Sequence, residues 1–158
     1  MHTTITAMEF ESMLFVRHLT LTAARRTARN IDRSAYTILT CLDESREMSM
    51  AELSETLGLD TSTLSRQTSA MLQAGLIERI PDPNGGIARK FRSTAEGSER
   101  LHDACEANAQ LLQEVTADWS PHEVDNFAHL LGRFNRGIEL LDQRPWPRPS
   151  SIDDQQQG

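Results

Sequence analysis

Aromatic residues, cysteines and long apolar runs are scarce in this chain of 158 residues. Only 5% of the residues are aromatic, and the apolar set is mostly Leu, Ile, Ala and Met, which favours helices. No run of 18 apolar residues exists, so we expect no membrane span. The N-terminus lacks the basic start and apolar stretch of a signal peptide. Cys41 and Cys105 do not make a disulfide framework, so the expected compartment is the reducing cytoplasm.

Enzyme motifs are absent as well. The sequence contains no Gly-rich phosphate loop after a strand, no G-x-S-x-G elbow and no H-E-x-x-H motif. We therefore expect neither an enzyme nor a bound cofactor. The length corresponds to about one domain with added helices, and 38% apolar residues suffice for a core.

Of three consecutive segments of the chain, only the middle one carries a net positive charge. The net charge is −7, which argues against a generic nucleic-acid binder. Residues 60–93, however, carry 5 Arg or Lys against 3 Asp or Glu, whereas residues 94–158 carry 5 against 12. Lys90, the single lysine, lies in the positive segment. This segment is therefore either a nucleic-acid contact surface or a solvated patch on an acidic protein.

Residues 49–75 contain the signals of two short helices joined by a tight turn. Ser49 and Glu52 have the spacing of a capping box, which marks the start of the first helix. A glycine ends that helix, Asp60 can cap the second, and Gly75 terminates it. Two short helices connected in this way predict a helix-turn-helix.

The second helix of this pair, after Asp60, has two chemically different faces. Ser62, Ser65, Arg66 and Ser69 follow the spacing i, i+3, i+4 and i+7 and share one exposed stripe. Small hydroxyls allow close approach to DNA, and an arginine can contact guanine with two hydrogen bonds in the major groove. The alternative is an ordinary amphipathic helix with a serine-rich outer face. The opposite face, expected to point into the core, consists of Leu64, Met71, Leu72 and Ala74.

A β-hairpin is predicted at residues 76–93. Residues 76–80 and 89–93 read as strands, and "PDPNGGIARK" forms the tip between them. Prolines stiffen the first half of the tip, whereas Asn84, Gly85 and Gly86 tolerate positive φ and turn the chain back. A helix-turn-helix followed by a hairpin is a winged helix-turn-helix, which we place at residues 34–97.

Helices are expected on both sides of the winged helix. Residues 1–33 are predicted to form an N-terminal dimerisation helix, residues 98–143 C-terminal dimerisation helices, and residues 144–158 a flexible tail. The last helix carries apolar residues at heptad-like spacing, which is typical of a helix that packs on a partner. The predicted dimer interface comprises Phe10, Leu14, Val124, Phe127, Leu131, Phe134, Ile138 and Leu141.

The segments "LGLDTSTLSRQTSAMLQAGLIER", "PDP" and "STAEG" resemble the MarR family, the multiple-antibiotic-resistance-type regulators. The order of predicted helices extends the resemblance to about residues 8–142. It implies a mainly α fold with a small β-wing, in which a winged helix-turn-helix DNA-binding region is joined to N- and C-terminal dimerisation helices. It also implies a homodimer on a double-stranded, pseudo-palindromic operator. Such proteins are often repressors released by a small-molecule effector, aromatic or acidic, near the junction of the two regions.

The resemblance and the exposed stripe together nominate the residues that contact DNA, with Arg66 as the main base-reading candidate. Two departures from the family stand out. Thr68 replaces an aliphatic residue, and Gly85, Gly86 and Ile87 stand where the family has Asp, any residue and Arg. We therefore expect a mobile wing without its carboxylate brace, whose cations contact phosphates. The candidate DNA-binding residues are Ser62, Thr63, Ser65, Arg66, Gln67, Ser69, Arg79, Arg89 and Lys90.

Two other functions are consistent with a winged helix. A redox- or metal-responsive regulator would use Cys41 and Cys105, or His102 at three residues before Cys105. Both cysteines, however, lie on apolar helical faces, where we expect buried and inert thiols. No metal site is predicted. The other alternative is a winged helix that binds proteins, for which Arg66 would be dispensable.

Overall fold

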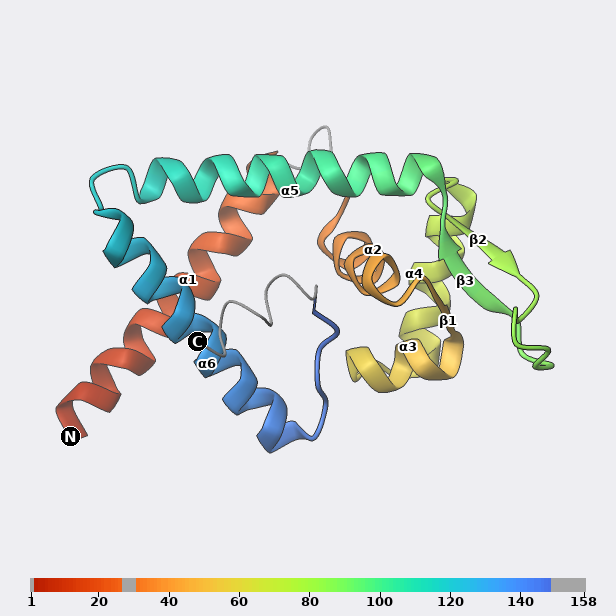
Figure 1. The fold of residues 1–158 in the computed structure, drawn as a ribbon, viewed down its shortest axis with the longest axis horizontal. Coiled ribbons are helices and arrows are strands. Elements are labelled where there is room, and N and C mark those ends of the chain that lie inside the picture. The colour runs from red at the N-terminus through yellow and green to blue at the C-terminus, as the bar shows by residue number, and fades with distance from the viewer. Residues whose placement is uncertain (1, 27–30, 149–158) are drawn as a thin grey trace.

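The computed structural model describes residues 2–26 and 31–148. The helices are α1 (His2–Arg26), α2 (Arg33–Ser45), α3 (Met50–Leu57), α4 (Thr61–Gln73), α5 (Ala95–Val115) and α6 (Pro121–Asp142); the strands are β1 (Glu47–Ser49), β2 (Ile77–Ile80) and β3 (Lys90–Ser93). Helix α5 spans the molecule, with the winged helix at its N-terminal end and α1 and α6 towards its other end (Figure 1). The predicted mainly α fold with a small β-wing is confirmed.

Local capping signals account for where the helices begin. The Ser49 backbone N–H donates to Glu52 Oε2 at 2.6 Å, and the Glu52 N–H donates to Ser49 Oγ at 3.2 Å, so the predicted capping box is present. Asp60, Thr94 and Ser120 each accept a hydrogen bond from a backbone N–H in the first turn of α4, α5 and α6. These side chains satisfy N–H groups that would otherwise lack a partner.

One hydrophobic core lies inside the winged helix. Its buried residues come from α2, β1, α3, α4, the hairpin and the first turns of α5, with Leu39, Leu53 and Leu64 fully buried. Of the residues expected on the inner face of α4, Leu64 and Met71 are buried and Leu72 is partly buried. Ala74 is exposed instead, because it caps the C-terminus of α4 and follows the last helical turn. We call residues 31–104 the winged-helix body.

The wing sheet has three strands, one more than the sequence predicts. The strand order is β1-β3-β2, and both pairings are antiparallel. Strand β1 has only three residues and lies directly before α3, so its sequence gives no alternating pattern. Strand β1 therefore forms only through its pairing with β3. As a result, the wing is joined by backbone hydrogen bonds to the start of the helix-turn-helix.

Helix α1, the part of α5 after residue 104, and α6 form the arms of the molecule. Helix α1 begins at His2, within the range predicted for the N-terminal helix, and α6 has no buried residue at all. Phe10 and Phe134 remain 53% and 46% exposed in the single chain. The arms therefore present apolar side chains that no described residue covers. None of the described helices is long and apolar enough to cross a bilayer.

Part of the predicted flexible tail is held in place. Residues 149–158 lie outside the described residues, but Trp146 is half-buried and packs against the core of the winged-helix body. Glu139 on α6 accepts hydrogen bonds from the Trp146 backbone N–H at 3.3 Å and from the Arg148 guanidinium. Residues 144–148, predicted to begin a flexible tail, are in contact with both the winged-helix body and α6, through the half-buried Trp146 ring and the Glu139–Arg148 ion pair.

Candidate nucleic-acid interface

Helix α4 presents the predicted DNA-reading stripe to solvent. Its N-terminus follows Gly58, which adopts φ of 63° and ends α3, so the two helices are joined by a tight turn. Ser65, Arg66 and Ser69 are exposed, and their side chains make no hydrogen bond or ion pair to any residue that the structure describes. Three unpaired polar side chains on one face of a rigidly capped helix are available to phosphates and base edges.

Ser62 and Thr63 are engaged differently. The Ser62 hydroxyl donates to Asp60 Oδ1 at 2.5 Å, and the Thr63 hydroxyl donates to Asp60 Oδ2 at 2.7 Å. These bonds, first of all the one from Ser62, hold the pKa of Asp60 well below its usual range. Both hydroxyl protons are therefore committed to the cap in the free chain. Contact of Ser62 or Thr63 with DNA stays a prediction, in which these residues would act mainly as acceptors.

Gln67 and Thr68 lie at the inner edge of α4. Gln67 is half-buried, and its side-chain oxygen is buried without a hydrogen-bond donor among the described residues. Thr68 is completely buried and donates to the Leu64 carbonyl at 2.9 Å. The departure from an aliphatic residue at Thr68 is therefore accommodated, because its hydroxyl is satisfied within its own helix.

The wing carries several cations with different partners. The Arg79 guanidinium lies 5.4 Å from the centre of the Phe91 ring, a cation–π distance. Arg89 is exposed and makes no ion pair with a described residue. Ile87, in the place of the expected family arginine, is fully exposed at the tip. Of the three predicted wing cations, Arg79 and Arg89 thus face solvent.

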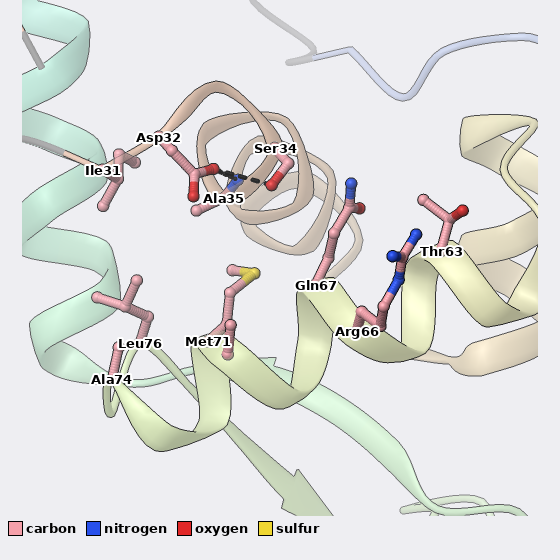
Figure 2. Close-up of a pocket in the computed structure, with 11 residues that line it drawn as sticks. Ile31, Asp32, Ser34, Ala35, Thr63, Arg66, Gln67, Met71, Ala74 and Leu76 are labelled. Atoms are coloured by element: carbon pink, nitrogen blue, oxygen red, sulfur yellow. Dashed lines mark hydrogen bonds between the residues drawn. The ribbon is translucent and has the colours of Figure 1, made fainter.

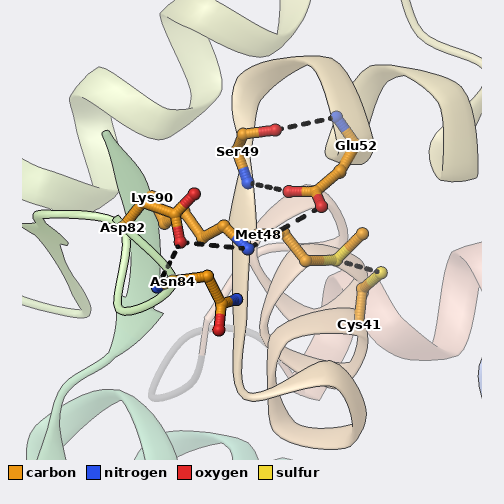
Figure 3. Close-up of polar contacts among 7 residues, drawn as sticks. All are labelled: Cys41, Met48, Ser49, Glu52, Asp82, Asn84 and Lys90. Atoms are coloured by element: carbon orange, nitrogen blue, oxygen red, sulfur yellow. Dashed lines mark hydrogen bonds and ion pairs between the residues drawn. The ribbon is translucent and has the colours of Figure 1, made fainter. Parts of the chain in front are cut away.

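Lys90 is the third wing cation, and it is covered. Its ammonium lies 3.8 Å from Glu52 Oε1 and 3.9 Å from Asp82 Oδ1, and its side chain is only 13% exposed (Figure 3). The prediction that the wing lacks a carboxylate brace is therefore wrong. Asp82 supplies the carboxylate from an earlier position in the loop, and Lys90 supplies the cation from β3. Sequence alone does not predict Glu52 and Asp82 as partners of Lys90, because strand register, rather than a local motif, brings them to it.

A pocket of about 430 Å³ lies between the start of α2 and the inner side of α4 (Figure 2). Arg66 and Gln67 contribute polar atoms, and Met71 and Leu76 contribute apolar surface. Asp32 also lines it, but one of its oxygens accepts from the Ala35 N–H at 2.8 Å and caps α2. The complete lining consists of Ile31, Asp32, Ser34, Ala35, Thr63, Arg66, Gln67, Ala70, Met71, Ala74 and Leu76.

The two cysteines differ in exposure. Cys41 is buried, as expected, and burial raises the pKa of its thiol. Cys105 is exposed, contrary to expectation, because α5 projects beyond the core at this point; its Sγ lies 3.6 Å from the Tyr36 hydroxyl. His102 is also exposed, and its Nε2 lies 3.3 Å from Glu106 Oε1. The described residues contain no cluster of three or more His, Cys, Asp or Glu suited to a metal ion.

Comparison with known proteins agrees with the helix-turn-helix described above. The MarR family model matches residues 31–85. An uncharacterized HTH-type transcriptional regulator of Bacillus subtilis (strain 168), YxaD, is 33% identical over 132 residues, which cover 83% of this chain and 92% of YxaD.

Two solved structures share the fold. A mutant of E. coli MarR complexed with operator DNA aligns with a TM-score of 0.54 and 20% identity, over 79% of this chain and 96% of that chain. The PcaV transcriptional regulator from Streptomyces coelicolor, in complex with its natural ligand, aligns with a TM-score of 0.59 and 22% identity, over 80% of this chain and 92% of that chain. The chain therefore belongs to the MarR family of transcriptional regulators, whose DNA-binding element is the winged helix.

Proposed function

We propose that the protein is a homodimer that binds a pseudo-palindromic operator and represses transcription until a small molecule releases it. The observation that carries the DNA-binding part is the exposed stripe of Ser65, Arg66 and Ser69 on α4. Its hydroxyl and guanidinium groups match the donors used in the major groove. The operator complex of the E. coli MarR mutant supports the same use of this fold.

The arms support the homodimer. Val124, Phe127, Phe134 and Ile138 recur along α6 at heptad-like spacing and are each more than one-third exposed in the single chain. An apolar stripe of this size is costly in water and is covered when a second copy packs its own arms against it. Two copies related by a two-fold axis would place their α4 helices in successive major grooves. Half-sites about 10 bp apart, centre to centre, are the expected operator geometry.

Arg66 provides the direct test of operator reading. Genome-wide selection of bound fragments identifies the operator, and Arg66→Ala is then expected to weaken its binding by about 1–3 kcal/mol. The same change should relax base preference at one position in each half-site. Arg133→Ala removes an equal charge from α6 instead of α4 and serves as the control. Equal affinity of wild type and Arg66→Ala for the operator would remove Arg66 from the reading set, whereas failure of the wild type to select any DNA fragment would favour a protein-binding winged helix.

The pocket between α2 and α4 is the proposed effector site. Arg66 offers a cation to an acidic ligand, Met71 and Leu76 offer apolar surface to an aromatic ring, and the unpaired Gln67 oxygen accepts a hydrogen bond. A ligand held by Arg66 competes directly with DNA for the same guanidinium. This mechanism explains release without a large change of shape. The ligand complex of PcaV supports small-molecule binding by this fold.

A substitution that fills the pocket tests effector binding independently of operator binding. Ala74 lines the pocket at the C-terminal end of α4, away from the reading stripe. Ala74→Phe is expected to preserve operator binding while abolishing release by whichever aromatic acid, from a panel, releases the wild type. Gel-shift titrations of both proteins measure this. Release that persists unchanged in Ala74→Phe would place the effector elsewhere.

A further inference from the structure

Strand register gives Lys90 an unusual position. It lies on β3, the central strand of the wing sheet, opposite Ser49 of β1 and Ile80 of β2. Ser49 is also the N-cap of α3, so the first turn of that helix begins beside Lys90. The chain after Ile80 leads directly into the wing loop. Lys90 is thus a neighbour of both the helix-turn-helix and the loop.

Two carboxylates from these two neighbours face the Lys90 ammonium. Glu52 comes from the first turn of α3, and Asp82 comes from the wing loop (Figure 3). The side chains of Lys90 and Asp82 are only 13% and 15% exposed, so solvent screens their interaction less than that of a surface pair. Three charged groups with a net charge of −1 offer no excess positive charge to a phosphate.

Asp82 also organises the backbone of the wing loop. Its Oδ1 accepts from the Asn84 N–H at 2.9 Å, and its carbonyl accepts from the Gly85 N–H at 3.0 Å. A side-chain carbon at Gly86 would collide with the Asp82 carboxylate, so the loop folds closely over it. Anchoring Asp82 therefore anchors the turn that carries the wing tip.

We propose that Lys90 is a positioning residue that clamps the wing loop to α3 and so sets the orientation of the wing relative to the recognition helix. This inference rests on the proposed operator binding. It replaces the expectation that Lys90 contacts a phosphate. Of the neighbouring pair Arg89 and Lys90, Arg89, which is exposed and unpaired among the described residues, is left to contact the DNA backbone.

Conservative substitutions isolate the charge of each partner. Lys90→Met keeps the aliphatic stem, and Asp82→Asn keeps the Oδ1 acceptor for the Asn84 N–H. Arg89→Met is the matched control, because it removes the same charge one residue away. Hydrogen exchange of the wing-loop amides is measured in the free protein, and thermal unfolding verifies that each variant is folded. Operator affinity is then measured as a function of salt concentration.

The clamp predicts the same behaviour for the two partners. Exchange of the wing-loop amides should accelerate in Lys90→Met and Asp82→Asn and stay unchanged in Arg89→Met. Lys90→Met and Asp82→Asn should each weaken operator binding by about three- to tenfold. The double variant should bind the operator as tightly as Lys90→Met alone, because both changes break the same ion pair. Weakening by Asp82→Asn is the decisive sign, because losing a negative charge near DNA otherwise favours binding. The salt slope should fall by about one only in Arg89→Met.

Two results overturn the clamp. One is unchanged wing exchange in both Lys90→Met and Asp82→Asn. The other is tighter operator binding by Asp82→Asn together with a reduced salt slope in Lys90→Met, which identifies a direct phosphate contact. Absence of operator binding by the wild type contradicts the proposed function instead, and the exchange measurement on free protein still decides the clamp.

Discussion

The winged-helix body and the arms are built from similar residues but bury them to opposite extents. Every residue of the buried core lies between Ala35 and Leu101, in the body. Helix α6 is as amphipathic as the helices of the body, yet none of its residues is buried. A helix buries its apolar face only against another element, and the body provides such elements within one chain. The body thus buries its apolar residues within one chain, whereas the arms leave theirs exposed, where the proposed homodimer would cover them.

The largest expected effect comes from charging the apolar stripe of the arms. Phe134→Asp places a carboxylate in the proposed interface and should give monomers or insoluble protein, because an unpaired charge is costly to bury. Size-exclusion chromatography with light scattering measures the assembly. Asn135→Asp, one residue along, adds the same charge on a different side of α6 and should leave the dimer intact. A soluble dimer of wild-type size in Phe134→Asp would sink the interface assignment.

Two glycines test the difference in packing between the body and the arms, because Gly97 is tightly packed and Gly137 has open space beside it. A Cβ at Gly97 would overlap the Leu76 carbonyl oxygen, where α5 meets the turn after α4. Gly97→Ala should therefore destabilise the protein by about 1–3 kcal/mol, as overpacking does. A Cβ at Gly137 in α6 meets nothing within 4 Å in the single chain.

Gly137→Ala is the control for Gly97→Ala, and urea denaturation measures both. In an open helix the change should stabilise by about 0.5–1 kcal/mol, because alanine loses less backbone entropy than glycine. Destabilisation by Gly137→Ala would mean that the partner's arm approaches α6 closely at this point. A neutral Gly97→Ala would contradict the close packing of α5 on the body.

Trp146 joins the two regions, and its expected effect is similar to that of Gly97→Ala. Its half-buried ring packs on the body, while its backbone N–H donates to Glu139 of α6. Trp146→Ala should lower the free energy of unfolding by about 2 kcal/mol through lost apolar burial, without changing the dimer. Pro145→Ala, at an exposed neighbour, is the control for the same urea titration. Equal stability of Trp146→Ala and wild type would show that residues 144–148 do not fasten the arms to the body.

The smallest expected effect is on acid stability. The Ala35 backbone N–H is the main cause that lowers the pKa of Asp32, the N-cap of α2. Because the folded pKa lies below the unfolded one, this contribution is present above about pH 4 and is lost as pH falls through the folded pKa. Asp32→Asn keeps a capping oxygen but does not titrate. Its unfolding free energy should therefore fall less than that of wild type between pH 7 and pH 3; an equal fall would contradict this role.

The sequence alone determined the parts of the molecule that depend on near neighbours. The capping box of Ser49 and Glu52, the cap at Asp60 and the exposed stripe around Arg66 all involve residues within about two helical turns. Spacing along the chain specifies such interactions directly. For this reason the helix-turn-helix, the two strands of the wing hairpin and the family could be predicted from the sequence.

The tertiary structure decided what depends on residues far apart in the chain. Strand β1 exists because it pairs with β3, and the same register brings Glu52 to Lys90. The pocket between α2 and α4 and the docking of Trp146 also arise only when separate elements pack. No local pattern in the sequence specifies these contacts, because the partners lie in elements far apart in the chain. Lys90 thus appeared to be a free cation in the sequence and is a covered ion-pair partner in the fold.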